Sequence, residues 1–395
     1  MRRGDDGPRQ RLAAQRHGLL LDAAREPALV ARGRELGIQV YCSIRINDYH
    51  FWSDDARREP PLRPEEMASV TRPHLTPLRK EHPEWCLGID RAPRWAATSW
   101  NIAIPEVREY RLRYIAEACR LADWDGVELD WQRHAFHLPE DDAYRLRYTL
   151  TDLQRAVRGL ANEIAAARGR PFYVTVRVGA SLETCRRVGY DLETWMHDGL
   201  CDLVATNANS GTDPGVDIET YLELAREREI PLYPGLDSHG ESGLGHLIGA
   251  STWREAWYRG LAQGFLARGA SGIYIFNWHA TRDSHRSLLT TLGALKTLRG
   301  RDKVYAAIKR HIRDRSELRY GAERDDRLYG EVPVALYSTS TGTGPLFHVA
   351  VHDRAADARI VTLYIELAHF TPTDQIAVAL DGRRLDAPEV RSTAS

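Results

Sequence analysis

Two carboxylates, Glu128 and Asp130, stand two positions apart in the stretch Trp124-Asp-Gly-Val-Glu-Leu-Asp-Trp-Gln-Arg-His134. Successive side chains of an extended strand alternate between its faces, so the two acids share one face while Val127 and Leu129 share the other. Burying an unpaired carboxylate is strongly unfavourable, so the acidic face must meet water, a ligand or a cation. The pattern predicts a strand that lines a cleft or a barrel mouth, and internal salt bridges to arginines are the alternative.

Paired carboxyl groups are the apparatus of glycoside hydrolysis, in which one acts as the acid and the other as the nucleophile or base. Asp130 is the first candidate for the ionised role, because Arg133 or Arg177 would hold it charged. Three carboxylates remain open as its partner, namely Glu128, Asp48 and Asp237. A separation of about 5 Å would mean retention of configuration and roughly 6.5 to 9.5 Å inversion, and the sequence does not fix it.

Further polar and aromatic residues occur where other apolar stretches end. Amides and acids hydrogen-bond hydroxyl groups, and indole faces cover the apolar side of a sugar ring, so this mixture favours a carbohydrate substrate and needs no cofactor. The candidate binding residues are Arg45, Asn47, His50, Trp52, Trp100, Asn101, Arg133, His134, Arg177, Asn207, His239, Asn277, Trp278 and His279.

The arginines in this set indicate an anionic sugar, a uronate or a sulfated unit, bound through bidentate contacts. Arg45, Arg133 and Arg177 are the residues concerned. Pairing of each with Glu128 or Asp130 accounts for them equally well.

The elements that would position these residues are strands alternating with helical stretches, which predict parallel βαβ units. Seven strands are expected, ending near Asn47, Asn101, Asp130, Arg177, Asn207, Asp237 and Asn277. Active sites of (β/α)₈ barrels lie at the carboxyl ends of the strands. A doubly wound sheet is disfavoured because no glycine-rich phosphate turn is present. We therefore expect a TIM-like (β/α)₈ barrel of the α/β class, whose first strand is either hidden in the first forty residues or absent.

The expected domain order places this barrel in residues 36–283. Residues 1–35 read as a polar and helical lead, and residues 284–328 as a helical connector. Residues 329–395 alternate apolar and polar positions in short runs, which predicts a small antiparallel β domain with a hairpin turn at Asp381-Gly382.

Composition narrows the class of protein. Among 395 residues, Lys+Arg 54 and Asp+Glu 55 leave a net charge of -1, so no global field selects nucleic acid or an anionic membrane. No apolar run approaches the roughly 18 residues that span a bilayer. The first residues lack the apolar core of a signal peptide, so a cytoplasmic location is expected. The five cysteines form no Cys-x-x-Cys pair, which argues against a disulfide framework or a zinc site.

Five segments together resemble the glycosyl hydrolase family 10-like barrel proteins, a glycosidase-like group found largely in bacteria. They are Asp125-Gly-Val-Glu-Leu-Asp-Trp-Gln-Arg-His134, Arg45-Ile-Asn-Asp48, His82-Pro-Glu-Trp85, Pro105-Glu-Val-Arg108 and Tyr274-Ile-Phe-Asn277. The resemblance covers about residues 36–282 and implies a TIM-like barrel and carbohydrate chemistry. It carries over no catalytic pair, and members of the group usually have one more strand upstream of the one ending at Asn47.

The central segment is also similar to the chitinase motif D-G-x-D-x-D-x-E. In that motif the final Glu is the proton donor, and Gln132 stands in its place here, with Glu128 at the middle Asp. An amide does not supply a titrating proton, so chitinase activity of that type is disfavoured.

Two rival functions remain. His50, His134, His239 and His279 stand near acids, which allows a metal-dependent sugar isomerase or hydrolase, although no His-x-His or His-Glu-x-x-His spacing occurs. The other rival is a carbohydrate-binding barrel without activity, which Gln132 would suit. An incomplete barrel would also leave strand edges open, so a homo-oligomer or a covering N-terminal helix is expected.

Overall fold

The computed structural model describes residues 25–48, 77–88, 90–92, 96–207, 215–237, 251–278, 283–307, 336, 344–365, 367, 371 and 375–385. The chain divides into two compact units, residues 1–352 and residues 353–395. The first unit contains a six-stranded sheet, and the second contains a two-stranded sheet.

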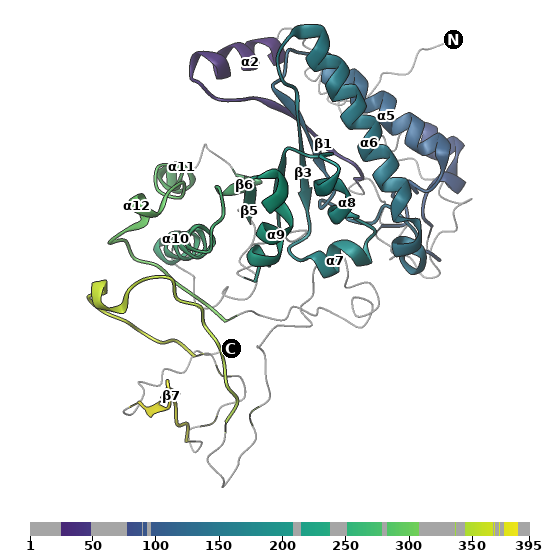
Figure 1. Ribbon diagram of the computed structural model, residues 1–395. Coiled ribbons are helices and arrows are strands. Elements are labelled where there is room, and N and C mark those ends of the chain that lie inside the picture. The colour runs from purple at the N-terminus through teal and green to yellow at the C-terminus, as the bar shows by residue number, and fades with distance from the viewer. Residues whose placement is uncertain are drawn as a thin grey trace, which may run out of the picture. The chain divides into compact units, whose positions relative to one another are not determined.

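The six-stranded sheet forms half of a barrel. Its strands are β1 (Tyr41–Arg45), β2 (Gly126–Asp130), β3 (Tyr173–Val178), β4 (Leu203–Thr206), β5 (Leu232–Asp237) and β6 (Tyr274–Phe276), and they pair in chain order, all parallel. A hydrogen bond of 3.1 Å from Tyr274 Oη to Glu128 joins β6 to β2 across the inner face, so the sheet curls back on itself (Figure 1). The expected α/β barrel is therefore confirmed as a partial one.

The strand expected at residues 95–101 is wrong, and the described sheet has six strands where seven were expected. Residues 96–99 form turns, and a single antiparallel bridge joins Trp100 to Cys86. The side chain of Asn47 forms hydrogen bonds with both backbone groups of Trp100. It accepts from the N–H at 2.9 Å and donates to the carbonyl at 3.0 Å. In the described sheet, β1 pairs directly with β2.

The described helices lie before, between and after the strands of the sheet. They are α2 (Arg25–Glu35), α4 (Pro77–Glu81), α5 (Pro105–Arg120), α6 (Ala143–Arg168), α7 (Leu182–Arg187), α8 (Leu192–His197), α9 (Ile218–Ala225), α10 (Ser251–Ala267), α11 (Asp283–Leu289) and α12 (Leu295–Leu298), with short 3₁₀ turns η2 (Pro83–Trp85), η4 (Glu140–Asp142) and η5 (Arg226–Arg228). Pro105 opens α5, where its missing N–H costs nothing, and Gly169 closes α6 at φ 67°. Within the described residues, no helix has the length and apolar character needed to cross a membrane.

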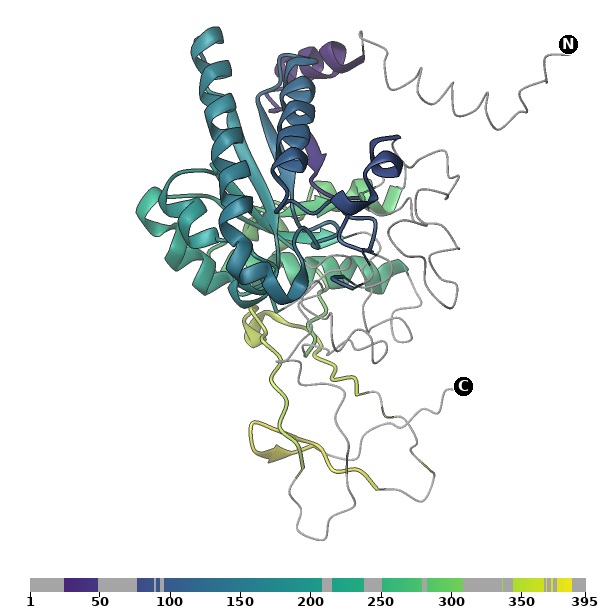
Figure 2. The same cartoon turned by 90° about the vertical axis from the view of Figure 1, so that its right-hand side faces the viewer.

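The core lies between the outer face of the sheet and the helices. Val127 and Leu129 of β2 stand in register with Val174 and Val176 of β3, and all four are 0% exposed. Helices α5 and α6 run side by side over this part of the sheet (Figure 2). The alternation expected for β2 and β3 is confirmed, because these four apolar residues face the helices while Glu128, Asp130 and Arg177 face inward.

The second unit keeps only part of the expected β structure. Strands β7 (Ala379–Leu380) and β8 (Arg383–Arg384) pair antiparallel, and η7 (Ala355–Asp357) lies upstream. Asp381 and Gly382 join the strands with φ of 49° and 76°, the left-handed pair that a tight hairpin turn requires, so this predicted turn is confirmed. Residues 346–351 and 359–365, expected as strands, are not strands in the structure.

Gly126 offers a test of the close contact between β2 and its neighbours. A Cβ at this position would lie 2.5 Å from Tyr41 Cε1 and would also meet the backbone carbonyl of Tyr173. We expect Gly126→Ala to lower the free energy of unfolding by about 2 to 4 kcal/mol, measured by urea denaturation, because the backbone carbonyl gives little.

The matched control is Gly159→Ala in the exposed face of α6, where an added Cβ meets nothing within 4 Å. It should raise the free energy of unfolding by roughly 0.5 to 1 kcal/mol. Equal effects of the two substitutions would contradict the packing described for Gly126.

Candidate active site

A row of charged side chains crosses the inner face of three neighbouring strands. Strand register places Asp130 of β2 between Arg45 of β1 and Arg177 of β3. Arg177 Nη1 donates to Asp130 Oδ1 at 2.7 Å, and the backbone N–H of Arg133 donates to the same oxygen at 2.9 Å. The side chains of Arg177 and Asp130 are 0% and 2% exposed, so this is a buried ion pair.

The burial of this pair changes the role expected of Asp130. A nucleophile or base must reach the substrate, and a carboxylate closed off in this way does not reach one. Burial lowers the pKa of the Arg177 guanidinium. The negative charge of Asp130 raises it and helps to outweigh burial, so the net pKa lies above its usual value. Arg177 thus stays charged, and the structure favours the salt-bridge alternative for Asp130 over the accessible carboxylate.

Glu128 has the opposite environment. Its Oε1 accepts hydrogen bonds from Ser43 Oγ at 2.6 Å and from Tyr274 Oη at 3.1 Å, and the residue as a whole is only partly buried. Burial of the carboxyl group raises its pKa, and the negative charge of Asp130 adds to the rise. Glu128 therefore resembles a carboxylic acid that holds its proton to higher pH than an ordinary glutamate.

Aromatic rings of β6 complete the inner surface. The guanidinium carbon of Arg177 lies 3.9 Å from the centre of the Phe276 ring, and those of Arg133 and Arg45 lie 5.8 Å and 6.0 Å from it. Tyr274 and Phe276 were not among the candidate site residues. Their inward parity, two positions apart in the last strand, is the sequence signal that could have found them.

Asn207 directs an amide into the same inner face. It follows β4, is 0% exposed, and neither its Oδ1 nor its Nδ2 has a hydrogen-bond partner. Its side chain lies over Gly235 of β5, where an added Cβ would come within 2.7 Å of it. A buried amide without partners is unfavourable, so this residue suits the predicted role of hydrogen-bonding a ligand.

Three other predicted binding residues, Asn47, Trp100 and Asn101, are buried, and the two asparagines form hydrogen bonds within the protein. Asn47 Nδ2 donates to the carbonyls of Trp100 and Phe136 at 3.0 Å and 2.9 Å. Trp100 is 2% exposed, which leaves no face for a sugar. Asn101 is 4% exposed and accepts from the backbone of Ala103 at 3.1 Å, just before α5.

His137 extends the Asn47 contacts and was not a candidate. Its Nε2 lies 2.8 Å from the carbonyl of Trp131, and its Nδ1 lies 3.1 Å from Asn47 Nδ2. The carbonyl only accepts and the amide nitrogen only donates, so the ring is neutral with its proton on Nε2. Burial lowers the pKa of His137 to about 4.

The remaining described candidates lie at the carboxyl ends of the strands. Asp48 Oδ2 pairs with Arg45 at 3.0 Å, and Asp48 Oδ1 lies 3.6 Å from Nδ1 of His134, which is buried. Asp237 is 0% exposed, and its backbone carbonyl accepts from Tyr258 at 3.0 Å.

After β6, Asn277 adopts φ 52° and is half-buried. The ring of Trp278 packs edge-on against Tyr258, with 5.2 Å between ring centres.

Four candidates, His50, Trp52, His239 and His279, lie outside the described residues. Within the described part of the chain, no group of three or more His, Cys, Asp or Glu side chains is arranged to hold a metal ion. Because three of the four histidines behind the metal alternative are not described, that alternative stays a prediction.

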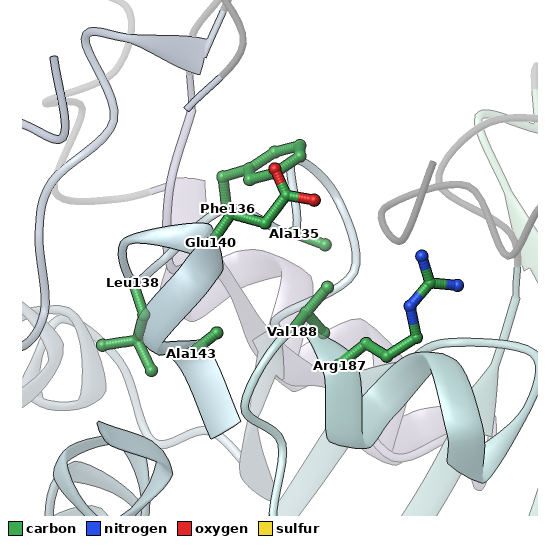
Figure 3. A pocket seen from close by; sticks show the side chains of 7 residues that line it. All are labelled: Ala135, Phe136, Leu138, Glu140, Ala143, Arg187 and Val188. Atoms are coloured by element: carbon green, nitrogen blue, oxygen red, sulfur yellow. The ribbon is translucent and has the colours of Figure 1, made fainter. Parts of the chain in front are cut away.

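Two other features, a small hollow and an ion-pair network, lie outside the inner face of the sheet. A small hollow beside η4 has an interior of about 10 Å³, room for no more than one water molecule (Figure 3). It is lined by Ala135, Phe136, Leu138, Glu140, Ala143, Arg187 and Val188.

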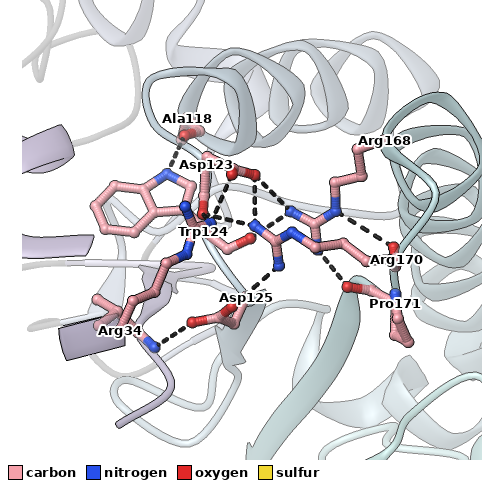
Figure 4. Close-up of polar contacts among 9 residues, drawn as sticks. Arg34, Ala118, Asp123, Trp124, Asp125, Arg168, Arg170 and Pro171 are labelled. Atoms are coloured by element: carbon pink, nitrogen blue, oxygen red, sulfur yellow. Dashed lines mark hydrogen bonds and ion pairs between the residues drawn. The ribbon is translucent and has the colours of Figure 1, made fainter. Parts of the chain in front are cut away.

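An ion-pair network joins the opposite, amino ends of β2 and β3 (Figure 4). Asp123 pairs with Arg34 and Arg170, each at 2.5 Å, and with Arg168 at 3.1 Å. Polar residues at this end of parallel strands support stability rather than catalysis.

Comparisons with known proteins give remote likenesses only. No family model matches the chain, and no curated protein matches it. The resemblance to the family 10-like proteins therefore stays a prediction.

Three of the solved structures that this chain matches illustrate how remote the likeness is. The glycoside hydrolase domain of PelA from Pseudomonas aeruginosa is 13% identical with a TM-score of 0.34, over 64% of this chain and 83% of that one. A glycoside hydrolase family 18 N-acetylglucosaminidase from Paenibacillus barengoltzii is 13% identical with a TM-score of 0.32, over 49% and 77%. Chitinase ChiA74 from Bacillus thuringiensis is 18% identical with a TM-score of 0.26. The match covers 35% of this chain and 26% of that one, so this chain spans about a quarter of the length of the chitinase. Likenesses this remote assign no activity.

The buried ion pair predicts a large effect of Asp130→Asn on stability. The substitution leaves Arg177 charged and buried without its carboxylate, so the free energy of unfolding should fall by about 3 to 5 kcal/mol in urea denaturation. Asp152→Asn is the control, since Asp152 forms an exposed pair with Arg155 at 3.6 Å and should change little. A loss of less than about 1 kcal/mol for Asp130→Asn would contradict the buried pair.

The lowered pKa of His137 predicts acid sensitivity. In the unfolded chain the imidazole titrates near its ordinary value of 6.5, and in the folded chain near 4, so the unfolded state binds more protons between these values. Stability from this group is complete above about pH 6.5 and declines as the pH falls to about 4, by on the order of 3 kcal/mol.

His137→Gln keeps a donor and an acceptor but does not titrate, so the free energy of unfolding measured between pH 7 and 4 should decline less steeply than in the wild type. His197→Gln, at a side chain 74% exposed, should keep the wild-type slope. An unchanged slope in His137→Gln would show that this histidine does not titrate as described.

Proposed function

We propose that the protein is a glycoside hydrolase in which Glu128 is the general acid. The observation that carries the proposal is the environment of Glu128, in which the carboxyl group has a raised pKa while the residue as a whole is only partly buried. Ser43 and Tyr274 both donate to Oε1, which leaves Oε2 as the oxygen that carries the proton. A carboxylic acid in this state protonates the leaving oxygen of a glycosidic bond.

Asp130 and Arg177 act in this proposal as positioning residues. The charge of Asp130 helps to keep the pKa of Glu128 high, while Arg177 opposes that rise and balances the buried charge. Neither side chain is exposed enough to contact a sugar. This assignment replaces Asp130 as the first choice for the catalytic carboxylate.

Asp48 is the proposed second carboxylate. Its side chain is 24% exposed, whereas Asp237, the other remaining candidate, is 0% exposed. Arg45 pairs with it at 3.0 Å, which favours the ionised form that a nucleophile or base requires.

A carbohydrate-binding protein without activity is the second candidate. Gln132, which occupies the position of the proton donor in the chitinase motif, is 0% exposed and so is held away from a substrate. Both functions use the same inner surface, and only activity separates them.

Substitution of Glu128 tests the proposal. In a screen of aryl glycosides and aryl uronides, Glu128→Gln should lower kcat by roughly 10²- to 10⁴-fold, because the amide has no proton to donate. The control is Glu109→Gln, on an exposed face of α5, which should retain wild-type rates. No cleavage of any substrate by the wild type, together with binding of a sugar, would favour the non-catalytic function.

Tyr274→Phe gives a second test that reports on the proton itself. Its hydroxyl donates to Glu128 and so lowers the pKa of the carboxyl group. Removal should raise that pKa and move the alkaline limb of the kcat profile to higher pH. A limb that stays in place, or moves to lower pH, would exclude Glu128 as the titrating acid.

A further inference from the structure

Two buried arginines lie behind the carboxyl end of β1, outside the row described above. Arg79 of α4 is 6% exposed and Arg111 of α5 is 7% exposed. Arg79 Nη1 makes a long contact of 3.5 Å to the carbonyl of Asp48, and Arg111 Nη2 donates to the carbonyl of Arg45 at 2.9 Å. The two guanidiniums therefore approach the same short segment, the last residue of β1 and the three that follow it.

Neither guanidinium has a carboxylate partner among the described residues. Arg79 lies over the ring of Trp100, 4.6 Å from its centre, and Arg111 lies over Tyr114 at 4.9 Å. The Nε atoms of both arginines are buried without a hydrogen-bond partner. Two cations are thus held in the interior by carbonyl oxygens and ring faces alone.

This arrangement is incomplete in energetic terms. Burial removes the hydration of an ion, and a contact with a ring face returns only part of that loss. Burial lowers the pKa of Arg111 to about 10, and the neighbouring charge of Arg79 lowers it further in the same direction. The other inward arginines, Arg45 and Arg177, each have an aspartate within 3.0 Å.

We propose that Arg79 and Arg111 form a binding site for one oxyanion group, a carboxylate, sulfate or phosphate. A planar guanidinium presents its N–H donors as a fork that matches two oxygens of such a group, and the Nε atoms without partners are part of that fork. The site adjoins Asp48, so the anion is either free in solution or carried by a charged sugar. Only the second source rests on the proposed glycosidase function.

An anionic sugar would then bind to arginines other than those expected from the sequence. Arg45 and Arg177, which suggested a charged sugar in the sequence, already pair with Asp48 and Asp130. Arg79 and Arg111 have no carboxylate partner among the described residues, so the proposed anion would bind to them.

Calorimetric and thermal-denaturation titrations of the full chain test the site. Sodium sulfate, sodium phosphate, glucuronate and neutral glucose are added at constant ionic strength in chloride buffer. At least one of the three oxyanions should bind saturably and raise the Tm, and glucose should not compete with it. Absence of saturable binding by all three oxyanions overturns the proposal without any variant.

Variants then assign the binding. Arg79→Gln and Arg111→Gln should each weaken binding of that anion at least tenfold, provided that each still unfolds cooperatively. Arg113→Gln, at an exposed position on the same helix as Arg111, removes the same charge and should bind as the wild type does. Equal weakening by Arg113→Gln overturns the site. If a glutamine variant does not fold, Arg111→Lys replaces it, since lysine keeps the charge and loses the fork.

The arms of the titration distinguish the sources. Binding of sulfate or phosphate but not glucuronate identifies a free anion, and glucuronate that competes with sulfate identifies a charged sugar. Glu128→Gln should bind the anion with wild-type affinity, because Glu128 is not among the groups that contact either arginine. Loss of activity with anion binding intact therefore tests the acid, and loss of anion binding tests the arginine site.

Discussion

The buried ion pair between Asp130 and Arg177 is the constraint on which the rest of the inner surface depends. Parallel pairing of β2 with β3 sets these residues side by side, and neither tolerates burial without the other. The pair also receives the backbone N–H of Arg133, which fixes the path of the chain as it leaves β2. Because the pair is closed to solvent, its charges act on their neighbours and not on a substrate.

Glu128 is a neighbouring residue whose pKa is raised by burial and by the charge of Asp130. It stands two residues before Asp130 on the same face of β2, with Ser43 and Tyr274 on one oxygen. Burial and the charge of Asp130 both favour its neutral form. A single strand thus carries one carboxylate that is locked in a buried ion pair and another whose pKa is raised.

Much of the fold followed from local patterns in the sequence. The alternation in β2 and β3 and the Asp381-Gly382 turn are each fixed by neighbouring residues, and the structure confirms them. The segment ending at Trp100 was misjudged because its backbone partner is the side chain of Asn47, 53 residues away. No local pattern reports a contact of that kind.

The site was harder to predict for the same reason. Two acids on one face were visible in the sequence, but the choice between them depends on the partner that each acquires from another strand. Arg177 reaches Asp130 from β3, and Tyr274 reaches Glu128 from β6. Arg79 lies at the end of a stretch rich in proline and arginine, where nothing in the sequence indicates that its side chain is buried.

The central claim is that the pKa of the Glu128 carboxyl group is raised in the folded protein, and the most direct measurement is its titration by carbon-13 NMR of protein labelled at glutamate carboxyl groups. The Glu128→Gln variant identifies the resonance. The account predicts that this resonance titrates above the ordinary glutamate value of 4.5. A Glu128 carboxyl group that titrates at or below that value would contradict the account.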